Sequence, residues 1–174
     1  MARFTILASC LLSCSLSAGE FSTGPVFDDF GKHTATDGIH FEKGQTFKVV
    51  FDIAKDAEVG TLNRSFNSLA RFINMHVANG IDMSNLQLAM VVHGAATHDL
   101  LTSKAYEKRH NSPSENVVLV NSLLEKGVSI LVCGQSAAAH KIEKNELLPG
   151  VRVVLSAMTA NAMLQQQGYT LNPF

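Results

Sequence analysis

Cys133 is the residue in this sequence best placed for chemistry. It follows the apolar run 128–132 and precedes Gly134, Gln135 and Ser136, so it stands where a strand is expected to pass into a helix. Backbone N–H groups and the positive end of the helix dipole gather at such a corner, and both favour thiolate, the nucleophilic form, over thiol. The alternative is a structural role, because free cysteine is among the most buried residue types and often only fills space.

Three further polar residues follow apolar runs in a similar way. Asp52 lies near the end of the run 46–53, His93 follows the run 86–92, and Ser156 follows a run that begins at Val151. A carboxylate and an imidazole close to a thiol would suit nucleophilic or sulfur-transfer chemistry. Their convergence depends on the order of the strands, which the sequence leaves open. His93 is equally well explained as a hydrogen-bonded residue that ends a strand.

The other motifs that would indicate a cofactor or a different enzyme class are absent from the sequence. The chain has seven histidines, but it contains no His-Glu-x-x-His and no Cys-x-x-Cys pair, so we expect no metal site and no cofactor. No glycine-rich phosphate-binding fingerprint follows the first apolar run, and Gly-x-Ser-x-Gly does not occur. These absences disfavour nucleotide binding and serine-esterase chemistry.

The elements that would position these residues alternate along the chain. Apolar runs rich in β-branched residues predict four strands, with a short edge strand after them. Patterns with helical spacing separate these runs, as in the stripe from Leu62 to Val77. Strict alternation implies right-handed crossovers and a largely parallel sheet covered on both faces. We therefore expect an α/β fold, a three-layer α/β/α single domain with a mostly parallel sheet of about five strands. The expected strands are 46–53, 86–92, 128–132, 151–155 and 169–171.

Local signals predict where several helices begin and end. Ser112-Pro113-Ser114-Glu115 predicts a helix start, with Ser112 as N-cap and proline at the first helical position. Gly127 and Gly168 are expected to close helices in a left-handed conformation, and the last helix is expected over 159–167.

The composition limits the classes of partner. The chain has 174 residues, of which 46% are hydrophobic and 17% charged, as is typical of one globular domain. The net charge is -1 and the pI is about 6.6, with no basic run. We therefore expect no nucleic-acid partner and no attraction to anionic membranes.

Residues 1–18 resemble a secretory signal peptide, with Arg3, a short apolar stretch and a small-residue end at Ala18. We expect export to the periplasm or secretion, and no membrane span, because the apolar stretch is too short. Cys10 and Cys14 lie in this segment, and lipid attachment there is the less favoured alternative. Residues 19–45 are expected to form an extended lead-in, and residues 46–174 the α/β domain. The mature chain would then hold Cys133 alone and no internal disulfide.

The segment from about residue 47 to the C-terminus resembles the exported branch of the DsrE/DsrF-like family. The most specific matches are Cys133-Gly134-Gln135-Ser136 and the ending Gln-x-x-Gly-Tyr at 165–169. In the best understood relatives, a cysteine at the end of the third strand carries sulfur as a persulfide, and Cys133 matches that position. The resemblance implies a compact α/β/α domain, a homo-oligomer, and sulfur donor or acceptor proteins as partners.

Three hypotheses for function follow. In the first, the chain is an exported sulfur-relay-like protein that carries sulfane sulfur as a persulfide on Cys133, with His93 or the helix dipole stabilising the anion. In the second, it is a non-enzymatic oligomeric binding or scaffold module of the same fold. In the third, Cys133 is a thiol redox sensor that forms a disulfide or a sulfenic acid. The sequence leaves catalytic turnover open.

Overall fold

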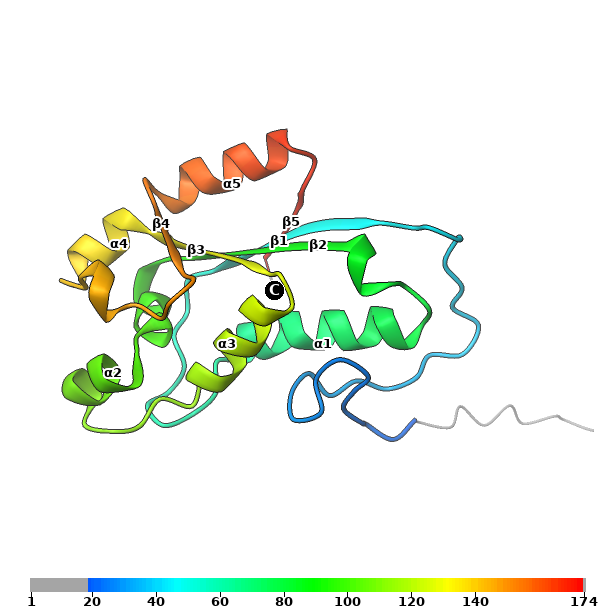
Figure 1. Cartoon of the computed structure of the whole chain (residues 1–174), viewed down its shortest axis with the longest axis horizontal. Coiled ribbons are helices and arrows are strands. Elements are labelled where there is room, and N and C mark those ends of the chain that lie inside the picture. The colour runs from blue at the N-terminus through cyan, green and yellow to red at the C-terminus, as the bar shows by residue number, and fades with distance from the viewer. Residues whose placement is uncertain (1–18, 174) are drawn as a thin grey trace, which may run out of the picture.

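The computed structural model describes residues 19–173, so the expected signal peptide, with Cys10 and Cys14, lies outside the described residues. Within the described part, five strands form one sheet, and each strand runs parallel to its neighbours (Figure 1). The order across the sheet is β4-β3-β2-β1-β5. The strands are β1 (Phe47–Ile53), β2 (Leu86–Val92), β3 (Ser129–Cys133), β4 (Arg152–Val154) and β5 (Thr170–Asn172). The expected parallel sheet is confirmed.

Helices cover the two faces of the sheet unequally. Two helices, α1 (Arg64–Ala78) and α3 (Val117–Glu125), lie on one face, and α5 (Ala157–Gln166) lies on the other (Figure 1). This arrangement is the expected three-layer α/β/α fold. The remaining helical elements are α2 (Ser103–His110), α4 (Gly134–Ala139) and the short 3₁₀ segments η1 (Met83–Asn85), η2 (Gly94–Leu100) and η3 (Lys144–Glu146). None of the helices in residues 19–173 combines the length and the apolar character needed to cross a bilayer.

The strand order explains the unequal cover. From β1 to β4 each new strand is added on the same side of the last, so right-handed crossovers place α1 and α3 on one face. The connection from β4 to β5 returns across the whole sheet to the far side of β1. A right-handed crossover in this reverse direction must pass over the opposite face, and α5 forms that crossing.

Two apolar cores follow from the three layers. The larger core lies between the sheet and the α1 and α3 helices, and it contains the largest fully buried side chains, such as Phe51 and Phe66. The smaller core lies under α5 and is built from Val50, Ala89, Val91, Leu131, Cys133, Ala157 and Ala160. Most of these side chains are small, so α5 can pack close to the sheet.

The segment before β1 packs against α1. Asn74 of α1 is fully buried, and its side chain accepts hydrogen bonds from the N–H groups of Val26 and Phe27 at 3.0 and 2.9 Å. The same side chain donates to the carbonyl oxygens of Phe27 and Phe30. Phe27 itself is buried in the larger core. The lead-in therefore closes the outer side of α1.

The predicted start of one helix is wrong. α3 begins at Val117 rather than after Ser112, and the Ser112 hydroxyl donates to the Pro113 carbonyl oxygen at 3.5 Å instead of capping a helix. Asn116 decides the position, because its side chain accepts from the Asn63 N–H at 2.7 Å and so fixes the chain before the helix. A tertiary contact has overridden a local capping pattern.

The other predicted helix ends are close to those observed. Gly127 and Gly168 have φ of 84° and 88°, as the capping prediction requires. The last helix begins two residues earlier than predicted, at Ala157, because the Ser156 hydroxyl accepts from the Thr159 N–H at 3.0 Å and caps it.

Candidate functional site

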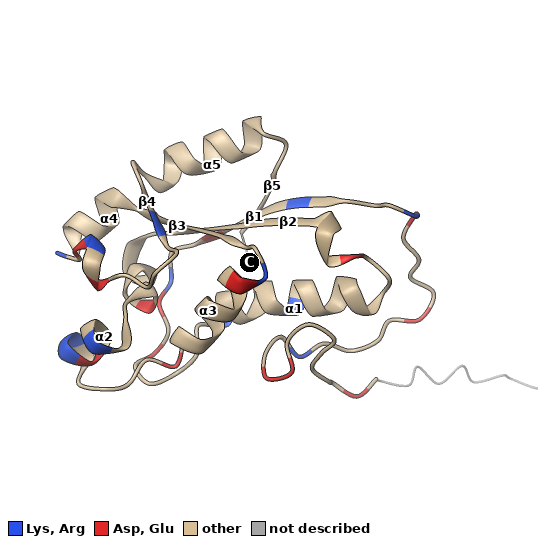
Figure 2. Cartoon of the chain, viewed as in Figure 1, with Lys and Arg blue, Asp and Glu red and all other residues tan. Residues whose placement is uncertain are grey.

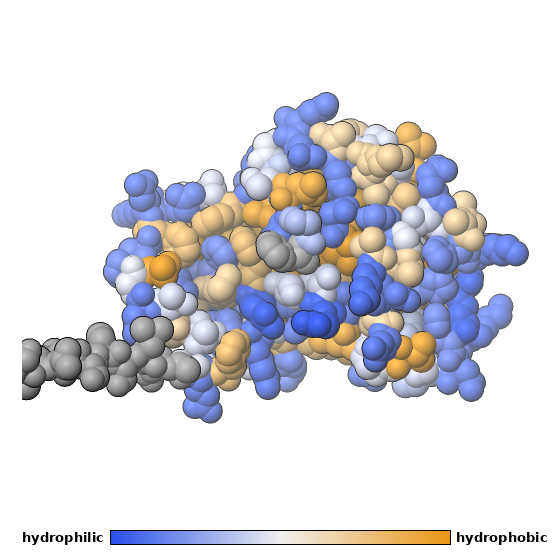
Figure 3. All heavy atoms as spheres, turned by 180° about the vertical axis from the view of Figure 1, so that it is seen from behind, coloured by the Kyte–Doolittle hydropathy of each residue, from blue (hydrophilic) through white to orange (hydrophobic). Residues whose placement is uncertain are grey.

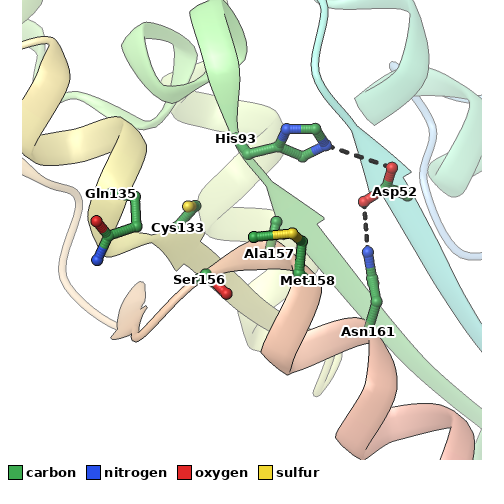
Figure 4. Close-up of a pocket in the computed structure, with 8 residues that line it drawn as sticks. All are labelled: Asp52, His93, Cys133, Gln135, Ser156, Ala157, Met158 and Asn161. Carbon is green, nitrogen blue, oxygen red and sulfur yellow. Dashed lines mark hydrogen bonds and ion pairs between the residues drawn. The ribbon is translucent and has the colours of Figure 1, made fainter.

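A cavity of about 250 Å³ opens at the carboxyl edge of the sheet, beside the start of α5. This volume is near the lower end of the range for ligand pockets, so it suits a small molecule or the tip of a side chain. Figure 4 shows the residues that line it: Asp52, His93, Cys133, Gln135, Ser156, Ala157, Met158 and Asn161.

The strand order and the two-residue period of the strands bring three of these residues together. β1, β2 and β3 are neighbours, and Asp52, His93 and Cys133 each stand at or just beyond the carboxyl end of one of them. Side chains alternate between the faces of a sheet, so these three residues share the face of Val50, Val91 and Leu131. That face is the one that α5 covers. Ser156 joins them from the end of β4.

Cys133 combines burial with stabilisation of its anion. Its side chain packs in the smaller core and is only 5% exposed, yet it also lines the cavity. Burial, the largest single effect, raises the pKa of the thiol. The Ser136 hydroxyl and the N–H groups of Ser136, Ala157 and Gln135 together outweigh it, so the pKa lies below its ordinary value.

The Ser136 hydroxyl is oriented by a neighbouring loop. Its oxygen accepts a hydrogen bond from the Gly94 N–H at 2.9 Å, so its own proton is free to point toward the sulfur of Cys133. Gly134 allows the close approach that this corner needs. A Cβ atom at this glycine would lie 2.8 Å from the Val154 carbonyl oxygen, which is too close for any other residue without movement of the backbone. Within the sequence Cys-Gly-Gln-Ser, Gly134 and Ser136 therefore each have a structural reason.

His93 and Asp52 form a pair at the other side of the cavity. His93 Nε2 lies 3.3 Å from Asp52 Oδ2, and both side chains are about 30% exposed, at 30% and 29%. Asn161 Nδ2 of α5 donates to Asp52 Oδ1 at 2.7 Å. In Figure 4 the His93 ring points toward Asp52 rather than toward Cys133. The groups that lower the thiol pKa do not include His93.

Sequence reasoning found Asp52, His93, Cys133 and Ser156 as residues of one edge, and the structure brings all four to one cavity. It missed Asn161, which is the polar partner of Asp52. A signal existed, because Ala157, Ala160, Asn161 and Leu164 form the helical stripe that faces the sheet, and an asparagine in such a stripe is unusual. The structure also gives Ser136 a place in the site, since its hydroxyl contacts Gly94 and Cys133.

The side chains of three histidines contact one another in a row away from this cavity. His98 Nδ1 lies 2.9 Å from His110 Nε2, and His98 Nε2 lies 3.1 Å from His140 Nδ1. Because the two nitrogens of His98 face different partners, the three rings do not converge on one point. Residues 19–173 contain no group of three or more His, Cys, Asp or Glu side chains arranged to hold a metal ion.

Comparisons with known proteins agree with this fold. The model of the DsrE/DsrF-like family matches residues 48–173. The solved structure of MTH1491, a protein of unknown function from Methanobacterium thermoautotrophicum, is 22% identical, with a TM-score of 0.53, and the match covers 74% of this chain and 99% of that one. The ychN protein from E. coli is 19% identical, with a TM-score of 0.54, and the match covers 74% and 100%. At these identities the two structures show a shared fold alone. No curated protein matches the chain.

Proposed function

Because the chain belongs to the DsrE/DsrF-like family, we propose that it is a sulfur-relay protein that carries sulfane sulfur as a persulfide on Cys133. The observation that carries this proposal is the environment of the thiol. Its sulfur lines a cavity, and the Ser136 hydroxyl and three N–H groups favour its ionised form. A thiolate that faces a small cavity is a nucleophile with room for one further sulfur atom.

The proposed loading step is a transfer of sulfane sulfur without net oxidation. The Cys133 thiolate attacks the outer sulfur of a donor persulfide, R–S–SH. A new S–S bond forms, the S–S bond of the donor breaks, and R–S⁻ leaves with the bonding electron pair. The products are Cys133–S–SH and R–S⁻. In this proposal His93 protonates the leaving thiolate and recovers its proton from water, while Asp52 holds the ring in place.

Delivery is the same reaction in reverse. The thiolate of an acceptor attacks the outer sulfur of the Cys133 persulfide, and Cys133 leaves as a thiolate. The donors around its sulfur stabilise the leaving group just as they stabilise the resting thiolate. The site therefore favours both loading and release over a permanent adduct.

The test is to detect the persulfide directly. The full-length chain is incubated with a small persulfide, alkylated under mild conditions, digested and measured by mass spectrometry. We expect the peptide with Cys133 to gain the mass of one sulfur atom beneath the alkyl group. Cys133→Ser is the matched control, and Cys10 and Cys14 are followed as separate peptides. If no donor adds sulfur at Cys133, the proposal is wrong, and the binding module remains. A disulfide or dimedone adduct instead would favour the redox sensor.

Assembly into a homo-oligomer is also part of the proposal. α5 has no charged residue, and it appears entirely tan in Figure 2. Met158 and Met163 of α5 are 81% and 53% exposed, and Leu155, just before the helix, is 70% exposed. Figure 3 shows apolar residues mixed with hydrophilic ones in the upper part of the molecule, where α5 lies. An uncharged outer helix with exposed methionines supports contact with another copy. Light scattering on wild type and Met163→Glu tests it, and a wild-type monomer at high concentration would refute it.

Export remains a proposal that rests on residues 1–18 of the sequence. Fractionation of cells that produce the full-length chain tests it. Recovery of a chain that has lost about eighteen residues from the periplasm or medium supports it. An uncleaved chain in the cytoplasm would contradict it.

A further inference from the structure

We propose that Asp52 makes the Cys133 cavity select sulfur donors by charge, so that cationic and neutral sulfane sulfur compounds are accepted and anions such as thiosulfate are disfavoured. This inference rests on the proposed function, because it concerns the donors of the same thiol. It assigns to Asp52 the role of a specificity-determining residue.

The described side chains that line the cavity supply a carboxylate but no permanent cation. Asp52 is the carboxylate, Cys133 adds a negative charge when it is ionised, and His93 is the basic side chain among them. Among the described residues, those that line it include no lysine and no arginine. α5, which forms one wall, carries no charge of either sign. Proteins that bind oxyanions normally use arginine or lysine side chains for the purpose.

The Asp52 carboxylate is fixed in the wall of this cavity. Asn161 Nδ2 donates to one oxygen at 2.7 Å, and His93 Nε2 lies 3.3 Å from the other. The carboxylate is therefore held by two elements besides its own strand. Its side chain remains 29% exposed, so it can still act on a molecule that enters.

The small size of the cavity makes this charge effective. Asp52 and Cys133 line the same cavity of about 250 Å³, so a donor whose sulfur reaches Cys133 comes near the carboxylate. The core beneath the cavity, with Ala157 and Ala160, is apolar, and a charge acts more strongly beside such a medium than in water. A unit charge at such a distance changes an encounter rate several-fold, and the effect has opposite sign for cations and anions.

Three methanethiosulfonate reagents with equal chain length test the proposal. They carry an aminoethyl, a hydroxyethyl or a sulfonatoethyl group, and each transfers its thioalkyl group to the thiolate and releases methanesulfinate. The measured quantity is the ratio of the cationic to the anionic rate constant for Cys133, at one neutral pH for all variants. A ratio of rates cancels any change in the ionisation of the thiol itself.

In wild type we expect the cationic reagent to react fastest and the anionic one slowest. In Asp52→Asn we expect the ratio to fall about tenfold. The control variant Asp82→Asn removes the same charge at an exposed position before β2, at the opposite edge of the sheet, and should leave the ratio unchanged. An unchanged ratio in Asp52→Asn, or an equal fall in Asp82→Asn, would overturn the proposal.

Folding of the variants is checked by thermal melting and by the rate with the neutral reagent. Asp52→Ser provides a second uncharged variant if Asp52→Asn does not fold. Added salt should also reduce the wild-type ratio without any substitution, and a ratio insensitive to salt would count against the proposal.

A second measurement separates this inference from the proposed function. Persulfide formation on Cys133 is compared for an aminoethyl persulfide and for thiosulfate, in wild type and Asp52→Asn. We expect the first donor to load wild type much faster, and the substitution to reduce the difference. If the reagents show charge selection but neither donor loads sulfur, the proposed function fails and the charge selection stands. If both donors load equally in wild type, the inference fails and the function stands.

Discussion

Two aspartates near the carboxyl edge of the sheet differ in burial and in hydrogen bonding. Asp52 has two side-chain partners, remains 29% exposed and lines the cavity of Cys133. Asp99, in η2, is 1% exposed. Its Oδ2 accepts from Asn63 Nδ2 at 2.7 Å and from the Ala57 N–H at 2.8 Å, and its Oδ1 accepts from Asn116 Nδ2 at 3.2 Å.

The surroundings of each carboxylate decide whether its role is structural or functional. Asp99 joins the loop after β1, η2 and the start of α3, and it leaves no side open to a ligand. Because Asp99 is buried and hydrogen-bonded in this way, it holds the loops behind the site in place. Asp52 is held firmly enough to be positioned but stays open enough to act on a molecule in the cavity. A buried carboxylate is tolerated only when N–H donors compensate for its lost hydration.

The largest expected effect is on stability, in a matched pair of variants. Asp99→Asn places an amide among three N–H donors and should lower the free energy of unfolding by about 3 kcal/mol. Asp52→Asn should lower it by less than about 0.5 kcal/mol, because its site is partly hydrated. Urea unfolding of both variants measures the difference. Equal losses would remove the distinction between the two sites.

The pH dependence of stability sharpens the same contrast. Burial raises the pKa of Asp99 above its ordinary value of 3.8, although the hydrogen bonds from Asn63 and Ala57 oppose the shift. The folded state then binds the proton more tightly than the unfolded state. The contribution of Asp99 to the stability of the folded state is fully present below about pH 3.8 and is lost as pH rises through the raised pKa. The stability cost of Asp99→Asn should therefore shrink from about pH 4 to pH 7. A cost that grows over this range would contradict the assignment.

A smaller effect is expected at the thiol. Ser136→Ala removes the hydroxyl that favours the Cys133 thiolate, so the thiol pKa should rise and the rate of iodoacetamide reaction should move to higher pH. The fold should be little changed, since the lost hydrogen bond from Gly94 is at a partly buried position. Gln135→Ala is the matched control, because Gln135 acts on the sulfur through its backbone N–H. A profile shifted equally in both variants would exclude the hydroxyl as the cause.

The smallest effect is expected at Ser112. Since α3 begins at Val117 and Asn116 is held by Asn63, Ser112→Ala should change the unfolding free energy by less than about 0.5 kcal/mol. Thermal melting beside the wild type measures this. A loss of about 1 kcal/mol would restore Ser112 as a cap and weaken the role given to the Asp99 network.

Much of the fold could be predicted because it depends on local patterns. β2 was predicted with its observed bounds, since a buried parallel strand is a continuous apolar run between turn residues. Gly127 and Gly168 were predicted as helix ends because positive φ favours glycine. The start of α3 was mispredicted because the Asn63, Asp99 and Asn116 contacts join distant segments, and no local signal reports them.

The sequence by itself determined the alternation of strands and helices, and with it the position of Cys133 at the end of a parallel strand. Only the tertiary structure decided that Asp52, His93 and Cys133 lie on the same face of three neighbouring strands, and that α5 brings Asn161 to them. Strand order depends on which crossovers bury the most apolar surface across the whole chain. No local pattern of residues reports this sum over distant contacts.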